Sequence, residues 1–280
     1  MAPIVSVICL CYNHARFIEE ALDSVMKQSY AQVELIIVDD ASTDGSIDVI
    51  KKWLTTHPGV PFAVNSDNLG NCKAFNRGLA MAHGKYIIDL SGDDCLSRER
   101  VERGVALMES RPEVGVQFSD AELIDADGNH LGYHADRFPH ATVPEGKIFR
   151  EILSHYFINS PTLMIRKSLL DELGGYDESL AYEDFDFLVR SSPKTSYAYL
   201  PEALVKRRLL PDSMGKQQYA QGSAQQRSTL TICQKAFTYC ASPDDFQALR
   251  LRVNYELRQS LRYAHWSLAW SYFGLLRKIP

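Results

Sequence analysis

Three pairs of adjacent acidic residues are the groups in this sequence whose type and spacing could carry out chemistry. They are Asp39-Asp40, Asp93-Asp94 and Glu183-Asp184. Carboxylates can offer hard oxygen ligands to a divalent cation, accept a hydrogen bond from a nucleobase N–H, or take a proton from a hydroxyl group. Which of these applies depends on where the fold places each pair.

The N-terminal part of the chain alternates short apolar runs with amphipathic segments. The apolar runs predict buried strands at Ile4–Cys11, Leu35–Val38, Val60–Val64 and Tyr86–Leu90, and the segments between them predict helices at Ala15–Gln28, Ser46–Leu54 and Ala74–Ala82. This alternation predicts a parallel, doubly wound α/β sheet. Ligands bind such sheets beyond the carboxyl ends of the strands, where the first two acidic pairs fall.

The pattern becomes mixed after about residue 96. It predicts a helix near Arg100–Ser110, a strand near Val114–Ser119 and a polar loop across Asp125–Pro144, followed by further helical and extended pieces. After Pro211 the chain is predicted to be helical to its last residue.

Several ordered motifs between about Val5 and Ser213 resemble those of the family 2 glycosyltransferases. They are Ser6-Val7-Ile8 through Tyr12-Asn13; Val38-Asp39-Asp40-Ala41-Ser42-Thr43-Asp44-Gly45-Ser46; Asn68-Leu69-Gly70 with Ala74, Asn76 and Gly78; Gly84-Lys85-Tyr86-Ile87 leading to Asp93-Asp94; and Gly174-Gly175-Tyr176-Asp177-Glu178 before Glu183-Asp184. The resemblance implies the GT-A fold, a Rossmann-like and mostly parallel α/β sheet with flanking helices, here with a helical C-terminal appendage. It implies a catalytic domain over residues 1–213 and a helical extension over 214–280. Within the domain, 1–95 would bind the nucleotide-sugar and 96–213 the acceptor.

The resemblance further implies transfer of a sugar, with inversion, from a nucleotide diphosphate-sugar to a hydroxyl acceptor. A UDP-sugar is the favoured donor, with dTDP- and GDP-sugars as alternatives, and the acceptor would be a glycan, a lipid-linked molecule or another hydroxyl compound. Asp40 matches the carboxylate that accepts a hydrogen bond from the nucleobase. The residues expected at the nucleotide-sugar are Cys11, Tyr12, Asn13, Asp39, Asp40, Asn68, Asn76, Ser91, Gly92, Asp93, Arg207 and Arg208. Asp44 is expected mainly to begin the helix that follows it.

Asp93 and Asp94 match the metal-binding motif of the family, which implies a Mn²⁺ or Mg²⁺ ion between protein and diphosphate. The family commonly has Asp-x-Asp-Asp, whereas the first of these positions is Ser91 here. We therefore expect the ion to be held weakly until the phosphates of the donor arrive.

Glu183-Asp184 resembles the base motif of the family, and Asp184 is the expected general base, with Glu183 as the alternative. Arg207 and Arg208 resemble a basic strand end whose cation faces the leaving diphosphate. The family often has a histidine two residues after the arginine, where this chain has Leu210.

Composition narrows the class of protein. Residues 1–199 contain 18 Lys and Arg against 30 Asp and Glu, whereas residues 200–280 contain 12 against 5. The acidic part argues against nucleic-acid binding, and the basic tail suggests an anionic partner surface. The six cysteines form no Cys-x-x-Cys pair, so we expect reduced thiols and no zinc site. No signal peptide or apolar run of about 18 residues is recognised, so we expect a cytoplasmic protein, with the inner face of the cell membrane as a further location.

The tail combines two apolar patterns. Apolar residues recur at three- and four-residue steps from Phe246 to Leu275, which predicts one helix face, and Trp266, Trp270 and Phe273 add a second face. A helix that is apolar nearly all round must be covered by something. The sequence leaves open its own domain, a twin subunit in a homo-oligomer, or peripheral contact with a lipid surface.

Two other functions remain open at this point. A nucleotidyltransferase also uses acidic metal ligands, although it would usually have a Gly-rich basic loop where this chain has Cys11-Tyr12-Asn13-His14. Ser91 and Leu210 suggest a catalytically inactive nucleotide-sugar-binding module. The resemblance favours an enzyme of bacterial polysaccharide or glycoconjugate biosynthesis.

Overall fold

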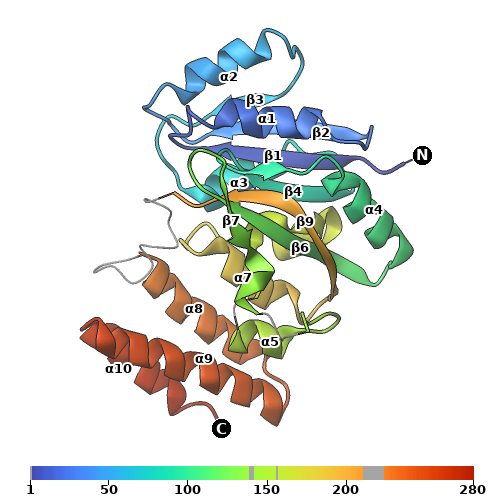
Figure 1. The fold of residues 1–280 in the computed structure, drawn as a ribbon. Coiled ribbons are helices and arrows are strands. Elements are labelled where there is room, and N and C mark those ends of the chain that lie inside the picture. The colour runs from blue at the N-terminus through green and yellow to red at the C-terminus, as the bar shows by residue number, and fades with distance from the viewer. Residues whose placement is uncertain (1, 139–141, 156, 211–223) are drawn as a thin grey trace.

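The protein is built around one mixed β-sheet. The structure, a computed structural model, describes residues 2–138, 142–155, 157–210 and 224–280. In these residues the sheet has the order β3-β2-β1-β4-β8-β6-β9-β5, with β7 paired to β6 (Figure 1). The strands are β1 (Val5–Cys11), β2 (Val33–Asp39), β3 (Phe62–Val64), β4 (Tyr86–Ser91), β5 (Cys95–Leu96), β6 (Val114–Ile124), β7 (His130–Tyr133), β8 (Met164–Arg166) and β9 (Ser196–Arg208).

The first four strands in the chain are parallel, as the sequence predicted. The helices that follow them are α1 (Ile18–Met26), α2 (Ser46–Leu54), α3 (Asn71–Leu79) and, after β5, α4 (Arg100–Ser110). Successive residues of β1 point to opposite faces of the sheet. Val7 packs in a core with Leu22 of α1 and Trp53 of α2, while Ile8 packs in a second core with Phe75 of α3. Helices therefore cover both faces, and the loops that carry polar residues are left at the carboxyl edge.

In the second part of the sheet, β8, β7 and β5 run opposite to β6 and β9. β8 pairs antiparallel with both β4 and β6, and β6 runs parallel to β9. The polar loop predicted across Asp125–Pro144 is only partly a loop, because it contains β7 and the 3₁₀ turn η1 (His134–Arg137). Residues 139–141 of this segment lie outside the described part. The Asp125 carboxylate accepts the N–H groups of Asp127 and Asn129, which closes a tight turn and lets β7 return along β6.

The remaining helices lie on the α3 face of the sheet (Figure 1). They are α5 (Phe149–Ser154), α6 (Lys167–Leu173), α7 (Glu183–Ser191), α8 (Ala224–Tyr239), α9 (Pro243–Arg262) and α10 (Trp266–Leu276), together with the 3₁₀ turn η2 (Ser160–Thr162). One core runs from Phe75 through Phe187 of α7 to Leu249 of α9 and Leu275 of α10. The predicted boundary between residues 213 and 214 lies outside the described residues, so the division of the chain into domains stays a prediction.

The C-terminal segment is two helices, which corrects the single helix face predicted from Phe246 to Leu275. The chain turns at Ala264, which has a left-handed φ of 57°, and His265 N–H bonds back to the carbonyl of Ser260. The turn directs Leu275 into the core and leaves the ring of Trp270 exposed. Among the described residues, no helix is both long and apolar enough to cross a bilayer.

Close packing of α3 on the sheet gives a test of this fold. A Cβ on Gly78 would lie 2.4 Å from Ile8 Cγ2 and 3.3 Å from Val38 Cγ2. Gly78→Ala should therefore lower the free energy of unfolding by about 1–3 kcal/mol, as measured by urea titration. Gly274→Ala in α10 is the control, because its Cβ would meet nothing within 4 Å. It should leave stability unchanged or raise it by up to about 1 kcal/mol. Equal effects of the two changes would contradict this packing.

Candidate active site

The loops after β1 and β2 are bound to one another at the carboxyl edge of the sheet. Asn13 Oδ1 accepts the N–H of Thr43 at 2.8 Å, and Ser42 Oγ accepts the N–H of Asn13 at 2.9 Å. Cys11 is buried with its Sγ 3.9 Å from Ser42 Oγ, and the ring of Tyr12 is exposed beside them. Three of the predicted donor residues thus stand together at one rim.

Asp39 and Asp44 shape this rim rather than face outward. The buried Asp39 carboxylate accepts the N–H and the hydroxyl of Ser42, at 2.8 and 2.6 Å. The Asp44 carboxylate accepts the N–H of Ser46 at 3.0 Å and that of Ala15 at 2.9 Å. Asp44 therefore supports the start of α2, as expected, and also links it to the loop after β1.

Asp40 is buried at the end of β2 and organises the loop before α3. One carboxylate oxygen accepts Asn65 Nδ2 at 2.6 Å and the N–H of Leu69 at 2.9 Å, and the other accepts the N–H of Gly70 at 2.8 Å. A carboxylate has about four acceptor positions, so one remains for a ligand N–H. The loop contacts were not foreseen from the sequence.

The two asparagines predicted at the donor have different surroundings. Asn68 Oδ1 accepts the N–H of Gly70 at 3.1 Å, within the loop that Asp40 holds. Asn76 instead joins α3 to the turn before α7: its Nδ2 donates to the Tyr176 carbonyl at 2.9 Å and to Glu178 at 3.0 Å, and its Oδ1 accepts the N–H of Tyr176. The hydrogen bonds of the Asn76 side chain among the described residues therefore hold α3 to this turn.

The end of β4 brings the second acidic pair to the same edge. Ser91 Oγ donates to Asp93, and the His14 ring lies 3.9 Å from the Asp93 carboxylate. Gly92 bonds the Leu10 carbonyl, so this segment is fixed to the end of β1. Asp94 is buried and accepts the backbone N–H of Arg208 at 2.8 Å. Burial, and then repulsion by Asp93, raise the pKa of the Asp94 carboxyl to about 8.

Arg208 is a structural residue in this arrangement. Its guanidinium donates to the Asp93 carbonyl at 3.0 Å, to the Asp125 carbonyl at 3.0 Å and to Glu20 at 2.7 Å. It also lies over the ring of Phe17, and its side chain is only 2% exposed. The guanidinium of Arg208 is therefore bound by groups of the protein itself.

Arg207 is less enclosed than Arg208. Its Nη1 donates to Asn159 Oδ1 at 3.0 Å, and the residue is half-buried. Its positive charge acts on two carboxyls from different parts of the chain, because it lowers the pKa of Asp94 and that of Asp184 against the opposite effect of burial. The charge of Arg207 therefore reaches a carboxyl of each of these two acidic pairs.

The third acidic pair begins α7. Asp184 accepts Ser160 Oγ at 2.6 Å and the N–H of Phe185 at 2.7 Å, and Glu183 accepts Asn71 Nδ2 at 2.7 Å. Burial raises the pKa of Asp184, and the two hydrogen bonds only partly oppose it. Burial and repulsion by Asp184 raise the pKa of Glu183 to about 7.

Sequence reasoning missed one carboxyl group, that of Asp89. It lies on β4 two residues before Ser91, on the same side of the strand, and accepts the Tyr176 hydroxyl at 3.2 Å. Burial and repulsion by Glu183 raise the pKa of Asp89 to about 7. An acidic residue inside the apolar run Tyr86–Leu90 was the signal that could have revealed it.

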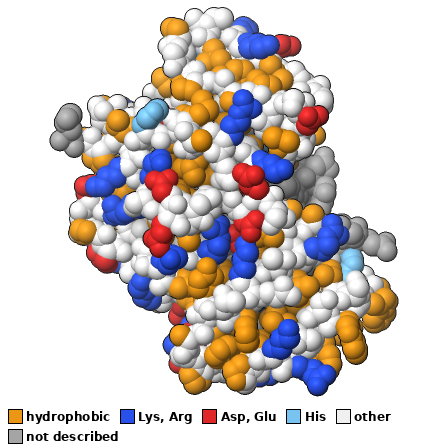
Figure 2. Space-filling view, turned by 180° about the vertical axis from the view of Figure 1, so that it is seen from behind, with side chains coloured by type: hydrophobic (Ala, Val, Ile, Leu, Met, Phe, Trp, Pro, Cys, Tyr) orange, Lys and Arg blue, Asp and Glu red, His pale blue; other side chains and the backbone are white. Residues whose placement is uncertain are grey.

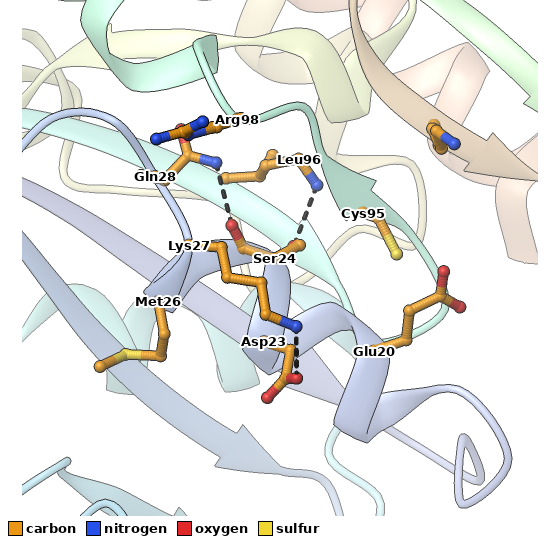
Figure 3. Close-up of a pocket in the computed structure, with 10 residues that line it drawn as sticks. Glu20, Asp23, Ser24, Met26, Lys27, Gln28, Cys95, Leu96 and Arg98 are labelled. Atoms are coloured by element: carbon orange, nitrogen blue, oxygen red, sulfur yellow. Dashed lines mark hydrogen bonds and ion pairs between the residues drawn. The ribbon is translucent and has the colours of Figure 1, made fainter.

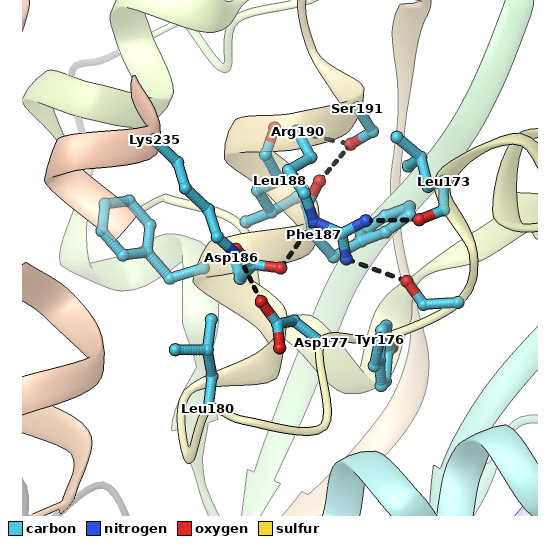
Figure 4. A network of polar contacts seen from close by, with 12 residues as sticks. Leu173, Tyr176, Asp177, Leu180, Asp186, Phe187, Leu188, Arg190, Ser191 and Lys235 are labelled. Atoms are coloured by element: carbon cyan, nitrogen blue, oxygen red, sulfur yellow. Dashed lines mark hydrogen bonds and ion pairs between the residues drawn. The ribbon is translucent and has the colours of Figure 1, made fainter. Parts of the chain in front are cut away.

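A buried polar network fixes α7 and its first turn (Figure 4). The Asp186 carboxylate accepts Arg190 Nε and Lys235 Nζ, both at 2.6 Å. Lys235 of α8 also donates to Asp177 at 2.6 Å, and Arg190 donates to the Gly175 carbonyl at 2.8 Å. The pKa of Asp177 is lowered, since the hydrogen bonds from Lys235 and Ser179 outweigh burial. The C-terminal helices thus help to position the third acidic pair.

A divalent cation fits this edge only as part of a larger ligand set. In the part of the chain that the structure describes, no three His, Cys, Asp or Glu side chains are close enough to hold a metal ion by themselves. Asp93 and Asp94 could offer hard oxygen ligands, and the raised pKa of Asp94 shows that burial and Asp93 disfavour its ionised form, which a bound cation would favour. The remaining ligands would have to be phosphate oxygens and water.

A cavity of about 750 Å³ lies elsewhere, between α1 and β5 (Figure 3). Glu20, Lys27, Arg98 and Lys206 are among the residues that line it. It contains none of the predicted donor, metal or base residues, so we do not assign it to the chemistry of the carboxyl edge.

Comparison with known proteins agrees with this architecture. Residues 6–174, more than half of the chain, match the family model described as Glycosyl transferase family 2. TuaG of Bacillus subtilis (strain 168), named as a teichuronic acid biosynthesis glycosyltransferase, is 33% identical over 163 residues, which are 58% of this chain and 62% of TuaG. The chain matches the first three curated relatives over only 62% to 64% of their lengths.

Two solved structures share the fold at low sequence identity. One is S. aureus TarS 1–349 in complex with UDP-GlcNAc, with 20% identity, a TM-score of 0.70, and coverage of 90% of this chain and 72% of that chain. The other is the mannosyltransferase PcManGT from Pyrobaculum calidifontis in complex with GDP-Man and Mn²⁺, with 20% identity, a TM-score of 0.70, and coverage of 96% and 76%. The predicted GT-A fold with a helical C-terminal appendage is confirmed. On the family match, the chain belongs to glycosyl transferase family 2.

Proposed function

We propose that this protein transfers a sugar, with inversion, from a nucleotide diphosphate-sugar to a hydroxyl acceptor, and that a Mn²⁺ or Mg²⁺ ion assists the transfer. The observation that carries the proposal is the electrostatic effect of Arg207. Its charge acts on both Asp94 of the metal motif and Asp184 of the base motif. Groups for the leaving diphosphate and for the acceptor proton are thereby within electrostatic reach of one cation.

A UDP-sugar is our preferred donor, with dTDP- and GDP-sugars as alternatives. The free acceptor position on Asp40 suits the ring N–H of uracil, thymine or guanine. The structural neighbours TarS and PcManGT were solved with UDP-GlcNAc and GDP-Man, respectively, so both nucleotide classes occur on this fold. The name of TuaG supports a role in bacterial cell-surface polysaccharide synthesis.

The proposed reaction is a single displacement. Asp184 takes the proton of the acceptor hydroxyl while the oxygen of that hydroxyl bonds to the anomeric carbon. At the same time the bond from the anomeric carbon to the diphosphate oxygen breaks. The leaving nucleoside diphosphate takes the bonding electron pair, and Arg207 faces its growing charge. A divalent ion bound at Asp93 and Asp94 would supply further charge neutralisation at the phosphates.

Electrostatics also support the metal. Asp89, Asp94 and Glu183 have raised pKa values because they are buried near other acids. A divalent cation bound at Asp93 and Asp94 would favour the ionised form of such carboxyls and would attract the diphosphate. PcManGT was solved with Mn²⁺, which suits the same hard oxygen ligands.

The two alternatives are weaker. Family membership favours glycosyl transfer over nucleotidyl transfer, and the loop after β1 is not Gly-rich or basic. An inactive binding module would bind nucleotide-sugar but release no nucleoside diphosphate.

The test is a thermal-shift screen of UDP-, dTDP- and GDP-sugars with and without Mn²⁺, followed by an assay for nucleoside diphosphate release. If no nucleotide-sugar raises the melting temperature and none is cleaved, the proposal fails.

Donor affinity should depend on Asp40. Asp40→Ala should weaken nucleotide binding by about 1–3 kcal/mol in calorimetry, because a charge-assisted hydrogen bond is lost. Asn65→Ala is the matched control, because it removes one hydrogen bond between the loop and Asp40 but keeps the Asp40 carboxylate. If Asn65→Ala weakened binding as much as Asp40→Ala, Asp40 would act by holding the loop instead of contacting the base.

Metal dependence should reside in Asp93 and Asp94. Changing both to Asn should abolish Mn²⁺-dependent activity and Mn²⁺ binding in the presence of UDP, since amides lack the carboxylate charge. Ser91→Asp should tighten Mn²⁺ without donor, as titration can measure. Asp127→Asn, at an exposed ion pair with Arg16, is the control and should change neither quantity. Wild-type turnover in the double variant would place the ion elsewhere.

Loss of the base should affect turnover but not donor affinity. Asp184→Asn should lower kcat on the order of 10²-fold or more while the dissociation constant for the donor stays nearly unchanged. Because burial raises the pKa of Asp184 and a base must be ionised, wild-type kcat should rise with pH through a value above the ordinary range for Asp.

Glu183→Gln separates the two acids of this pair, and NMR of the product reports its anomeric configuration. A small effect of Glu183→Gln is expected, together with an inverted product. A retained configuration, or full activity of Asp184→Asn, would contradict the mechanism.

A further inference from the structure

α10 has two apolar sides, and only one of them is covered by the protein. Tyr272 and Leu275 are buried on the inner side. On the outer side Trp266 is 68% exposed, Trp270 is 76% exposed and Phe273 is 46% exposed. These three positions are four and three residues apart, so they lie along one side of the helix, and the rings of Trp270 and Phe273 are 5.8 Å apart. Folding of this chain leaves this face, the aromatic face, in contact with solvent.

The neighbouring helix extends the apolar surface. Leu251, Tyr255 and Leu261 of α9 are also exposed. Figure 2 shows hydrophobic side chains gathered over the lower end of the molecule, where α9 and α10 lie, with Lys and Arg side chains among them. A contiguous apolar surface of this kind marks a binding site for a partner or a membrane more often than isolated exposed residues do.

The charged residues of the segment that carries the aromatic face have one sign. Residues 257–280 contain no Asp or Glu, although the whole chain has a net charge of −5. The four Lys and Arg residues of this segment, Arg258, Arg262, Arg277 and Lys278, are all exposed. The complementary partner must therefore present negative charge next to apolar material.

We propose that the aromatic face and the cations around it bind the surface of a membrane containing anionic phospholipid. Tryptophan and phenylalanine rings insert at the level between headgroups and acyl chains, and lysine and arginine bind the anionic headgroups. Contact at the surface, without a spanning helix, agrees with the properties of the described helices.

A second copy of this chain fits the face less well. A symmetric dimer places the same patch on both subunits. It would bring two sets of the four cations together with no acid from either segment 257–280 to pair with them. The lipid surface supplies both the apolar layer and the opposite charge. The proposal does not depend on which reaction the carboxyl edge performs.

Vesicle binding by the full chain tests the proposal. The probes are vesicles of POPC alone and of POPC with one third POPG, separated from free protein by sedimentation. The wild type should sediment with the POPG vesicles at low salt, and less at high salt, and should stay in solution with POPC. Its tryptophan emission should shift to the blue with POPG, because Trp266 and Trp270 are exposed whereas Trp53, the third tryptophan, is already buried.

Two variants separate the apolar and electrostatic contributions. Trp266→Ser with Trp270→Ser should weaken binding to POPG vesicles at least about tenfold, because binding strength scales with the apolar area inserted. Arg277→Glu with Lys278→Glu should abolish the part of POPG-vesicle binding that decreases at high salt. The matched controls change an exposed apolar residue, Met26→Ser, and two exposed lysines of α2, Lys51→Glu with Lys52→Glu, and should bind like the wild type. Circular dichroism melts should show that all variants stay folded, since the side chains are exposed.

Three results would overturn the proposal. The first is a wild type that does not bind POPG vesicles at low salt. The second is equal binding by the wild type and the tryptophan variant. The third is a dimer in analytical ultracentrifugation that dissociates when Trp266 and Trp270 are replaced, because the face would then be an interface between copies of the chain.

Discussion

Buried carboxyl groups at one edge of the sheet lie where the ionised form is disfavoured. Asp89, Asp94 and Glu183 have pKa values raised to about 7 or 8, and burial is the largest cause in each case. Burying a charge is unfavourable unless it is paired or hydrogen-bonded. The neighbouring helices and loops supply the hydrogen bonds and the positive charge that make this burial less unfavourable.

Only a few contacts stabilise the buried carboxyl groups. The positive charge of Arg207 lowers the pKa of both Asp94 and Asp184, and Ser160 and the N–H of Phe185 bond the Asp184 carboxylate. The start of α7 adds the positive end of a helix dipole to the same group. A bound cation would favour the ionised form of these carboxyls and would neutralise the diphosphate, which gives the proposed cation its physical reason.

The C-terminal helices act on this site through their inner sides. Lys235 of α8 bonds Asp177 and Asp186, and so joins the helical extension to the turn that precedes the third acidic pair and to α7 itself. The helices are therefore part of the scaffold of the site, whatever their outer faces bind. A surface contact at α10 and a precise site at α7 can coexist because the core between them, including Leu249 and Leu275, is continuous.

The sequence by itself determined the alternation of strands and helices, the parallel sheet and the positions of the polar loops, because hydrophobic periodicity and local turn residues fix these features. It also identified the family, which the comparison bears out. Only the tertiary structure decided which polar side chains are used internally, because hydrogen-bond partners such as Asn76 and Tyr176, or Arg208 and Glu20, are far apart in the chain. Burial likewise depends on the whole fold, so Asp89 could be identified as a further acidic position only when the fold brought it within electrostatic reach of Glu183. The same reason explains α10: its periodicity predicted two apolar faces, but the turn at Ala264 decided which of them the protein covers.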